Sequence, residues 1–250
     1  MKPDRIHLVD ELRGVAIIGM VIYHFLYTLS TLFSVNLGEN TLRVMQIIQP
    51  PLAGTFILIA GFTCRYSRAN VKRGLRTMLY GGLITLFTVI LVPSQAIYFG
   101  ILHFLGISML LYEWTHKWMD KANRYLMMSI LVVVFLVMFN LHKGILRIPL
   151  WGIIPLPEAL YQFVWLAPIG LPPRSFTSAD YFPLFPWFAL FLTGTLIGAQ
   201  VKEKGAPSIC YKTRSRVLSG IGGKSLVIYL LHQPLIYIFL WSISLFTPLV

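Results

Sequence analysis

The chain has 250 residues, of which 56% are hydrophobic and only 12% are charged, and its mean hydropathy is +0.72. Soluble domains carry about 25% charged residues, so the composition excludes a soluble globular protein and predicts a polytopic membrane protein with a single domain over residues 1–250. The net charge of +12 does not indicate a nucleic-acid partner, because basic residues beside apolar spans act as topology signals.

Seven apolar segments follow one another, each near the length that crosses a bilayer, which predicts an all-α bundle of about seven transmembrane helices. Prolines at 50–51 should break or kink the second helix at its outer end. The Pro-rich stretch 142–180 is too interrupted to span, so we expect an outer interfacial or re-entrant loop with a short helix near 158–166. The seven segments are 12–34, 45–64, 75–93, 97–115, 124–141, 181–200 and 224–246.

The first segment is too long for the hydrophobic region of a signal peptide, and no small-residue cleavage site follows it, so an uncleaved span is expected. It places His24 eleven residues after Arg13. In a helix, eleven residues correspond to about 16 Å and leave the two side chains about 20° apart on one face. His24 would then lie near the midplane of a hydrocarbon layer about 30 Å thick, where an ionisable group indicates function.

Lysine and arginine residues are distributed unevenly between the connecting segments. Assigning these segments alternately to the two sides places 17 of the 21 basic residues, from Lys2 to Lys224, on one side. The positive-inside rule then predicts a cytoplasmic N-terminus and an outer C-terminus, the reverse of rhodopsins and G-protein-coupled receptors. Cys64 and Cys210 fall at the cytoplasmic edge, where no structural disulfide is expected. The four outer basic residues are Arg43, Lys143, Arg147 and Arg174.

Other polar residues interrupt the apolar segments at similar depths. His232 lies near the middle of the seventh segment, His103 in the outer half of the fourth, Gln49 near the outer end of the second, and Asp180 where the sixth begins. We predict that His24 and His232 meet, and that the other three line an outer vestibule. The structural alternative is that the histidines only hydrogen-bond across helices and that Asp180 caps the sixth helix.

Two further patterns have structural interpretations. The small residues of 194–198 predict close helix packing. We interpret the basic cluster 65–76 mainly as a topology signal, with phosphate binding as a secondary role. Arg13 can form an ion pair with Asp10, one helical turn away.

Four motifs occur in this order: DELRGVAIIGM at 10–20, FGILHFLG at 99–106, DYFPLFPW at 180–187 and GKSLVIYLLHQP at 223–234. Together they resemble one bacterial membrane family, the heparan-alpha-glucosaminide N-acetyltransferase catalytic-domain-like family, over about residues 5–240. Arg13 and His24, with ten residues between them, also resemble the Arg-x10-His signature of the wider transmembrane acyltransferase group. In the lysosomal enzyme an asparagine stands where His24 does, and the catalytic histidine lies in the following loop. The loop 27–43 contains no histidine here, so His24 is the candidate.

The resemblance implies an integral protein of the bacterial cytoplasmic membrane that moves an acyl group, acetyl above all, from cytoplasmic acyl-CoA to a sugar hydroxyl or amine outside. His24 would act as general base or acyl carrier, because a buried imidazole stays neutral. The expected partners are acyl-CoA, a sugar or glycan acceptor and the lipid bilayer, with a homo-oligomer left open and no metal expected. The implied sites are catalytic His24 and Arg13; donor-binding Arg13, Arg65, Arg68, Lys72 and Arg73; and acceptor-binding His103, Asp180, His232 and Gln49.

Two other functions are consistent with the same residues. A transporter or flippase for a sugar or lipid-linked solute would use His24 and His232 as a proton relay. A membrane scaffold would use all of the polar residues for packing.

Overall fold

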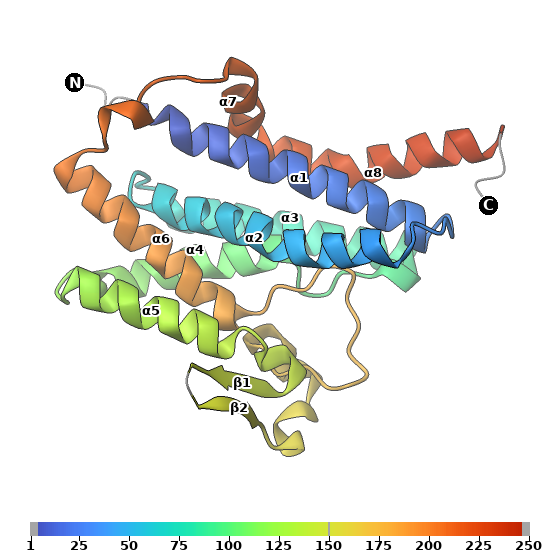
Figure 1. Ribbon diagram of the computed structural model, residues 1–250, viewed down its shortest axis with the longest axis horizontal. Coiled ribbons are helices and arrows are strands. Elements are labelled where there is room, and N and C mark those ends of the chain that lie inside the picture. Colours follow the sequence, from blue (N-terminus) through green and yellow to red (C-terminus); the bar gives the residue numbers. More distant parts are fainter. Residues whose placement is uncertain (1–4, 150, 247–250) are drawn as a thin grey trace. The chain divides into compact units, whose positions relative to one another are not determined.

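The computed structural model describes residues 5–149 and 151–246, and nearly all of its regular structure is helical. This confirms the predicted all-α class. The chain divides into two compact units, Met1–Ile59 with Gly205–Val250 and Ala60–Lys204, which are described separately below; Figure 1 labels their helices and strands.

The first unit contains three helices and the first part of α2. Helix α1 packs against α7 and α8. A Cβ on Gly14 would overlap the carbonyl oxygen of Leu218, and one on Gly222 would overlap that of Asp10, so glycine permits the α1–α7 contact. The helices are α1 (His7–Thr31), α2 (Glu39–Cys64), α7 (Arg216–Gly223) and α8 (Ser225–Ser244).

Helix α7 lies where the sequence predicted only a connecting loop. The Glu11 carboxylate of α1 accepts backbone N–H bonds from Arg214 at 2.7 Å and Ser215 at 2.9 Å. The Ser215 hydroxyl in turn accepts from the N–H of Leu218 at 3.2 Å. These acceptors bind three backbone N–H groups at and just before the start of the helix, so a glutamate more than 200 residues away stabilises α7.

Helix α2 continues through Pro50 and Pro51. Of the predicted break or kink at these residues, the break is therefore wrong and the kink stays a prediction, and the helix begins at Glu39, earlier than expected. The Thr55 hydroxyl donates to the Pro51 carbonyl at 2.8 Å.

The second unit is built on two helix pairs, α3 with α4 and α5 with α6. A Cβ on Gly74 would lie 2.9 Å from the carbonyl oxygen of Gly106 on the facing helix. A Cβ on Gly198 would lie 2.6 Å from that of Phe62, which confirms the close packing predicted from the small residues of 194–198. The helices are α3 (Asn70–Leu91), α4 (Ile101–Met119), α5 (Arg124–Met138) and α6 (Leu184–Lys204).

The segment between α5 and α6 forms a small β-hairpin, β1 (Ile145–Ile148) and β2 (Gly152–Pro155), with Ile145 opposite Pro155. Gly152, the first residue of β2, adopts φ 92°, which glycine does without strain. Two 3-10 helices follow at Glu158–Tyr161 and Val164–Ile169. The sequence predicted the non-spanning segment and a short helix in it but missed the hairpin, which Figure 1 shows beside the end of α5.

Among the described residues, six helices are long and apolar enough to cross a membrane: α1, α2, α3, α5 extended to Lys143, α6 and α8. The remaining expected span, the fourth (97–115), is present as α4, but its second half carries Tyr112, Glu113, His116 and Lys117. The chain is an integral membrane protein, and about seven spans is close to what the structure shows. The orientation stays a prediction, and Lys2 lies outside the described residues.

Candidate functional site

The two membrane-embedded histidines of the first unit lie in contact. His24 comes from α1 and His232 from α8, and their ring centroids are 4.9 Å apart. The sequence predicted that these rings would meet, and the structure brings them together. Their chemical roles stay predictions.

Two further side chains, Gln233 and Thr28, complete this group, which we call the α1–α8 cluster. The Gln233 side-chain nitrogen donates to Nδ1 of His24 at 3.2 Å, and the Thr28 hydroxyl donates to the Gln233 side-chain oxygen at 3.1 Å. A histidine that accepts at Nδ1 is neutral and carries its proton on Nε2. Sequence reasoning singled out neither residue, although Thr28 lies one helical turn after His24 and Gln233 directly follows His232.

His232 contributes an acceptor with no partner. Its Nδ1 lies 2.5 Å from the carbonyl oxygen of Tyr229 on the same helix, so Nδ1 carries the proton and donates it. Its Nε2 is buried and has no hydrogen-bond partner within the described part of the chain. A buried acceptor left open in this way is uncommon, and it can receive a hydroxyl or amine from a substrate.

Arg13 lies on α1, the helix that also carries His24, near its charged N-terminal end. Its Nη1 donates to the Asp10 carboxylate at 3.3 Å, and Arg5 Nε donates to the same carboxylate at 2.8 Å. The Asp10 pairing is thus present as the structural alternative predicted, and Arg13 remains partly exposed.

A basic cavity of about 560 Å³ lies in the second unit, at the C-terminal ends of α2 and α4. Arg65 makes a two-point ion pair with Asp120, with Nη1 2.8 Å from Oδ2, and its Nε donates to the carbonyl of Thr195. Its guanidinium also lies 5.6 Å from the centre of the Tyr112 ring. The Arg65 hydrogen bond lowers the pKa of Asp120. The Arg65 guanidinium is therefore engaged in structural contacts within the second unit.

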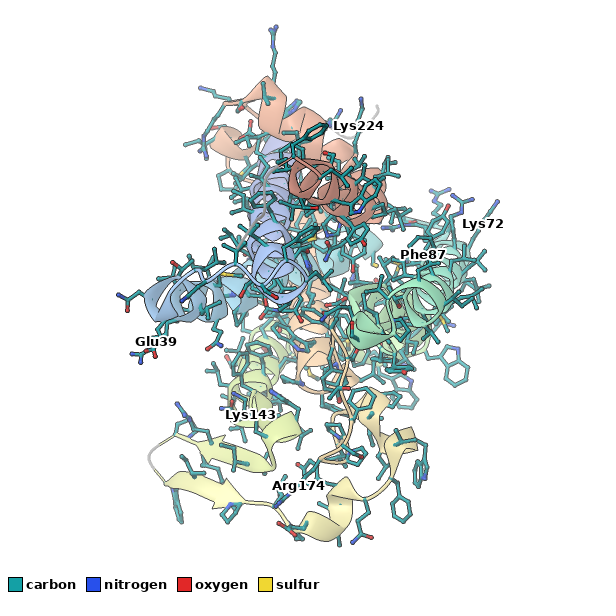
Figure 2. The ribbon with its side chains drawn as sticks, turned by 90° about the vertical axis from the view of Figure 1, so that its right-hand side faces the viewer. Glu39, Lys72, Phe87, Lys143, Arg174 and Lys224 are labelled. Atoms are coloured by element: carbon teal, nitrogen blue, oxygen red, sulfur yellow. The ribbon has the colours of Figure 1, made fainter. Side chains whose placement is uncertain are left out.

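The neighbouring cations differ in how far they are engaged. Arg73 donates to the Asn70 side chain at 3.2 Å. Arg68, which lines the cavity, and Lys72 are exposed, and neither has an ion-pair partner among residues 5–149 and 151–246. Figure 2 labels Lys72 on α3. Of the predicted donor-binding residues in this unit, these two are the most available.

His103 and Asp180 lie together at the other end of α4. The His103 ring stacks on Phe99 with centroids 5.8 Å apart, and its Nε2 is 3.5 Å from the Thr85 hydroxyl. The buried Asp180 carboxylate accepts the N–H of Ile101 at 3.0 Å. Asp180 therefore caps α4 and not the sixth span as its structural alternative proposed, because the chain at Tyr181 pairs with Phe99 before α6 begins.

The predicted outer vestibule draws on both units. Of its three residues, the partly exposed Gln49 belongs to the first unit, with the two histidines, and His103 and Asp180 belong to the second. Their convergence stays a prediction. Within the described residues, no group of three or more His, Cys, Asp or Glu side chains could hold a metal ion.

The chain matches the model of one protein family, described as heparan-alpha-glucosaminide N-acetyltransferase, catalytic, over residues 5–234. The match includes every element of the two units except the second half of α8. No curated protein and no solved structure matches the chain significantly.

Proposed function

Because the chain belongs to the heparan-alpha-glucosaminide N-acetyltransferase catalytic family, we propose that it is a membrane acyltransferase that moves an acetyl group from acetyl-CoA on the cytoplasmic side to a sugar hydroxyl or amine on the outer side. The observation that supports this best is the α1–α8 cluster, in which a neutral imidazole is held by hydrogen bonds beside an open buried acceptor.

A general base needs a lone pair that faces the acceptor. In the observed arrangement the lone pair of His24, on Nδ1, is taken by the Gln233 amide. An amide carries both a donor and an acceptor, and the Thr28 hydroxyl can donate or accept. Half a turn of the Gln233 amide would let its oxygen accept from Nδ1–H of His24 and leave Nε2 of His24 free as the base.

In the reaction, the acceptor oxygen or nitrogen bonds to the acyl carbon while its proton passes to Nε2 of His24. The carbon–sulfur bond of the donor breaks, and the thiolate of coenzyme A takes up that proton as it leaves. The alternative is that Nε2 attacks the acyl carbon first and carries the acyl group to the acceptor. The open Nε2 of His232 would accept a hydrogen bond from the acceptor in either case.

The donor is expected to bind through its phosphates. Arg13 lies on the same helix as His24, and Arg68 and Lys72 are exposed cations of the second unit. Arginine suits this role because it stays charged and binds phosphate through two hydrogen bonds. Arg65 would contribute less, since its donors already bind Asp120 and Thr195.

The test is transfer of radiolabel from acetyl-CoA to a sugar by the purified protein in lipid nanodiscs. The variant His24→Gln keeps a side chain that can hydrogen-bond to Gln233 but cannot act as a base, and the expected loss is about a thousandfold. Its thermal unfolding serves as the control for folding. Full turnover by a folded His24→Gln protein would overturn the mechanism, and label bound to the protein without acceptor would identify an acyl carrier.

A proton-coupled transporter remains the second candidate, favoured by the contact between the two histidine rings. Two titratable groups within the membrane can relay protons. Solute uptake into proteoliposomes that depends on a pH gradient and not on acyl-CoA would support it, and label transfer without such uptake would exclude it.

A further inference from the structure

The β-hairpin between α5 and α6 exposes apolar side chains on both of its faces. Trp151 is 86% exposed, Ile153 57% and Ile154 43%. Successive residues of a strand point to opposite faces, so Ile153 and Ile154 place apolar surface on each side of the hairpin. Antiparallel strands that face water alternate apolar with polar side chains, whereas residues 145–156 contain a single charged residue, Arg147. The hairpin is therefore not built to be surrounded by water.

The hairpin directly follows a membrane span. The apolar stretch that begins with α5 ends at Lys143, and no residue of α5 itself (Arg124–Met138) is buried, as expected of a helix that faces lipid. Strand β1 packs against α5 and, in Figure 1, runs back along that helix from its end. The apolar surface of the hairpin therefore adjoins the lipid-facing surface of α5.

The backbone of the hairpin limits how deep it can lie in a membrane. Within the described residues no third strand pairs with β1 or β2, so each strand has one edge that is not paired in a sheet. Open edges do not occur in the hydrocarbon region, because nothing there can hydrogen-bond to their N–H and C=O groups. Water and lipid headgroups can bind these groups at the membrane surface, where tryptophan is also enriched.

Two cations accompany the apolar side chains. Lys143 at the end of the span and Arg147 on β1 are exposed, and neither has an ion-pair partner in the described part of the chain. Figure 2 labels Lys143. Long basic side chains near a membrane surface cover apolar atoms with their stems and keep their charge among the headgroups, where the phosphates are their counter-ions.

From the two-sided apolar surface, the contact with α5 and the unpaired edges, we propose that the hairpin is an interfacial anchor. It binds the headgroup layer of the bilayer at the end of α5, which is the outer leaflet in the predicted topology. Trp151, Ile153 and Ile154 lie among the upper parts of the acyl chains, and Lys143 and Arg147 bind lipid phosphates. The anchor does not depend on the proposed acyltransferase function.

The first test measures the depth of Ile153 with a nitroxide spin label on the full chain, in nanodiscs of phosphatidylcholine and phosphatidylglycerol. Ile153→Cys carries the label in a Cys210→Ser background, because the other cysteine, Cys64, is buried. Collisions of the label with oxygen, which concentrates in the hydrocarbon, are compared with collisions with a nickel chelate, which stays in water. Labels at Leu79→Cys, exposed on α3, and at Ser175→Cys, exposed in the outer segment, are the lipid and water references.

We expect the label at Ile153 to collide more often with oxygen than with the nickel chelate. Its oxygen collision rate should be several-fold above that of the Ser175 label and below that of the Leu79 label. More frequent collisions with nickel would place the hairpin in water, and a rate equal to that at Leu79 would place it in the hydrocarbon; either result overturns the proposal. Low rates with both reagents would mean that a second copy of the chain covers the hairpin, which would also overturn it.

The second test needs no label, so it decides the proposal even if the Ile153→Cys protein does not fold. Phospholipids brominated near the headgroup quench tryptophan at that depth, and the difference between wild type and Trp151→Phe isolates the fluorescence of Trp151. That fluorescence should be quenched more by these lipids than by lipids brominated near the chain ends. The matched control is Trp187→Phe, because Trp187 is buried in the protein and should not be quenched. Equal signals from Trp151 and Trp187 would overturn the anchor.

Discussion

The α1–α8 cluster and the outer-loop pocket, a cavity of about 1070 Å³ lined by the segment between α5 and α6, place polar side chains in opposite environments. In the cluster, Thr28 and His232 are buried, and both Thr28 and His24 are hydrogen-bonded to Gln233. In the pocket, Lys143 and Arg174 are exposed, and water can replace any partner that is lost. When a buried polar group has no hydrogen-bond partner, nothing compensates the free energy of its desolvation. Single substitutions should therefore have much larger effects on the protein in the cluster than in the pocket.

Apart from His24, Gln233 is the cluster residue whose substitution should have the largest effect. We expect Gln233→Leu to lower the acetyl-transfer rate about a hundredfold, because His24 loses the group that orients its ring and selects its tautomer. The measurement is the pH dependence of transfer in nanodiscs. Gln233→Glu should restore part of the rate with a shifted pH profile, which a purely structural role would not produce.

The matched control is Gln46→Leu, the same change at an exposed position of α2, which should leave the rate unchanged. A Gln233→Leu protein with wild-type rate and pH profile would show that the hydrogen bond to His24 has no catalytic role.

The same contrast between tight and open surroundings can be measured within α7. A Cβ on Gly222 would overlap the carbonyl of Asp10, whereas one on Gly220 would meet nothing within 4 Å. Gly222→Ala should therefore destabilise the protein by about 1–3 kcal/mol, measured as thermal unfolding in detergent. Gly220→Ala should be neutral or slightly stabilising, and equal effects of the two would contradict the packing of α7 on α1.

The Arg65–Asp120 pair is intermediate in exposure between the cluster and the pocket, because the Asp120 side chain is 43% exposed. Because Arg65 lowers the pKa of Asp120 from 3.8, the pair stabilises the fold above that pH and loses its effect as the pH falls through the lowered value. The difference in unfolding temperature between wild type and Asp120→Asn should be largest near pH 6 and shrink below pH 3.8. A difference that grows on acidification would refute this assignment.

The smallest effect is expected at the rim of the pocket. Arg174→Ser removes an exposed ion pair with Glu158, so the free energy of unfolding should change by less than about 0.5 kcal/mol. Denaturant titration measures this change. A loss of several kcal/mol would mean that Arg174 is structural and would remove the contrast with the cluster.

Sequence reasoning identified half of the cluster and none of the pocket. His24 and His232 stood out because ionisable residues in apolar runs are rare. Thr28 and Gln233 did not, because threonine is common in membrane helices and the glutamine lies 205 residues further along the chain. The structural alternative for Asp180 was a cap of the sixth helix, but its carboxylate caps α4, because the fold brings the N–H of Ile101 to it. Its role in acceptor binding stays a prediction.

The sequence by itself determined that this is a helical membrane protein with a histidine deep in its first span, because hydropathy and helical periodicity are sums of local terms. Only the tertiary structure decided that Gln233 holds His24, that Glu11 caps α7 and that the outer segment encloses a pocket. A hydrogen bond forms only when donor and acceptor come within about 3 Å, and for partners some 200 residues apart that distance is set by the packing of whole helices.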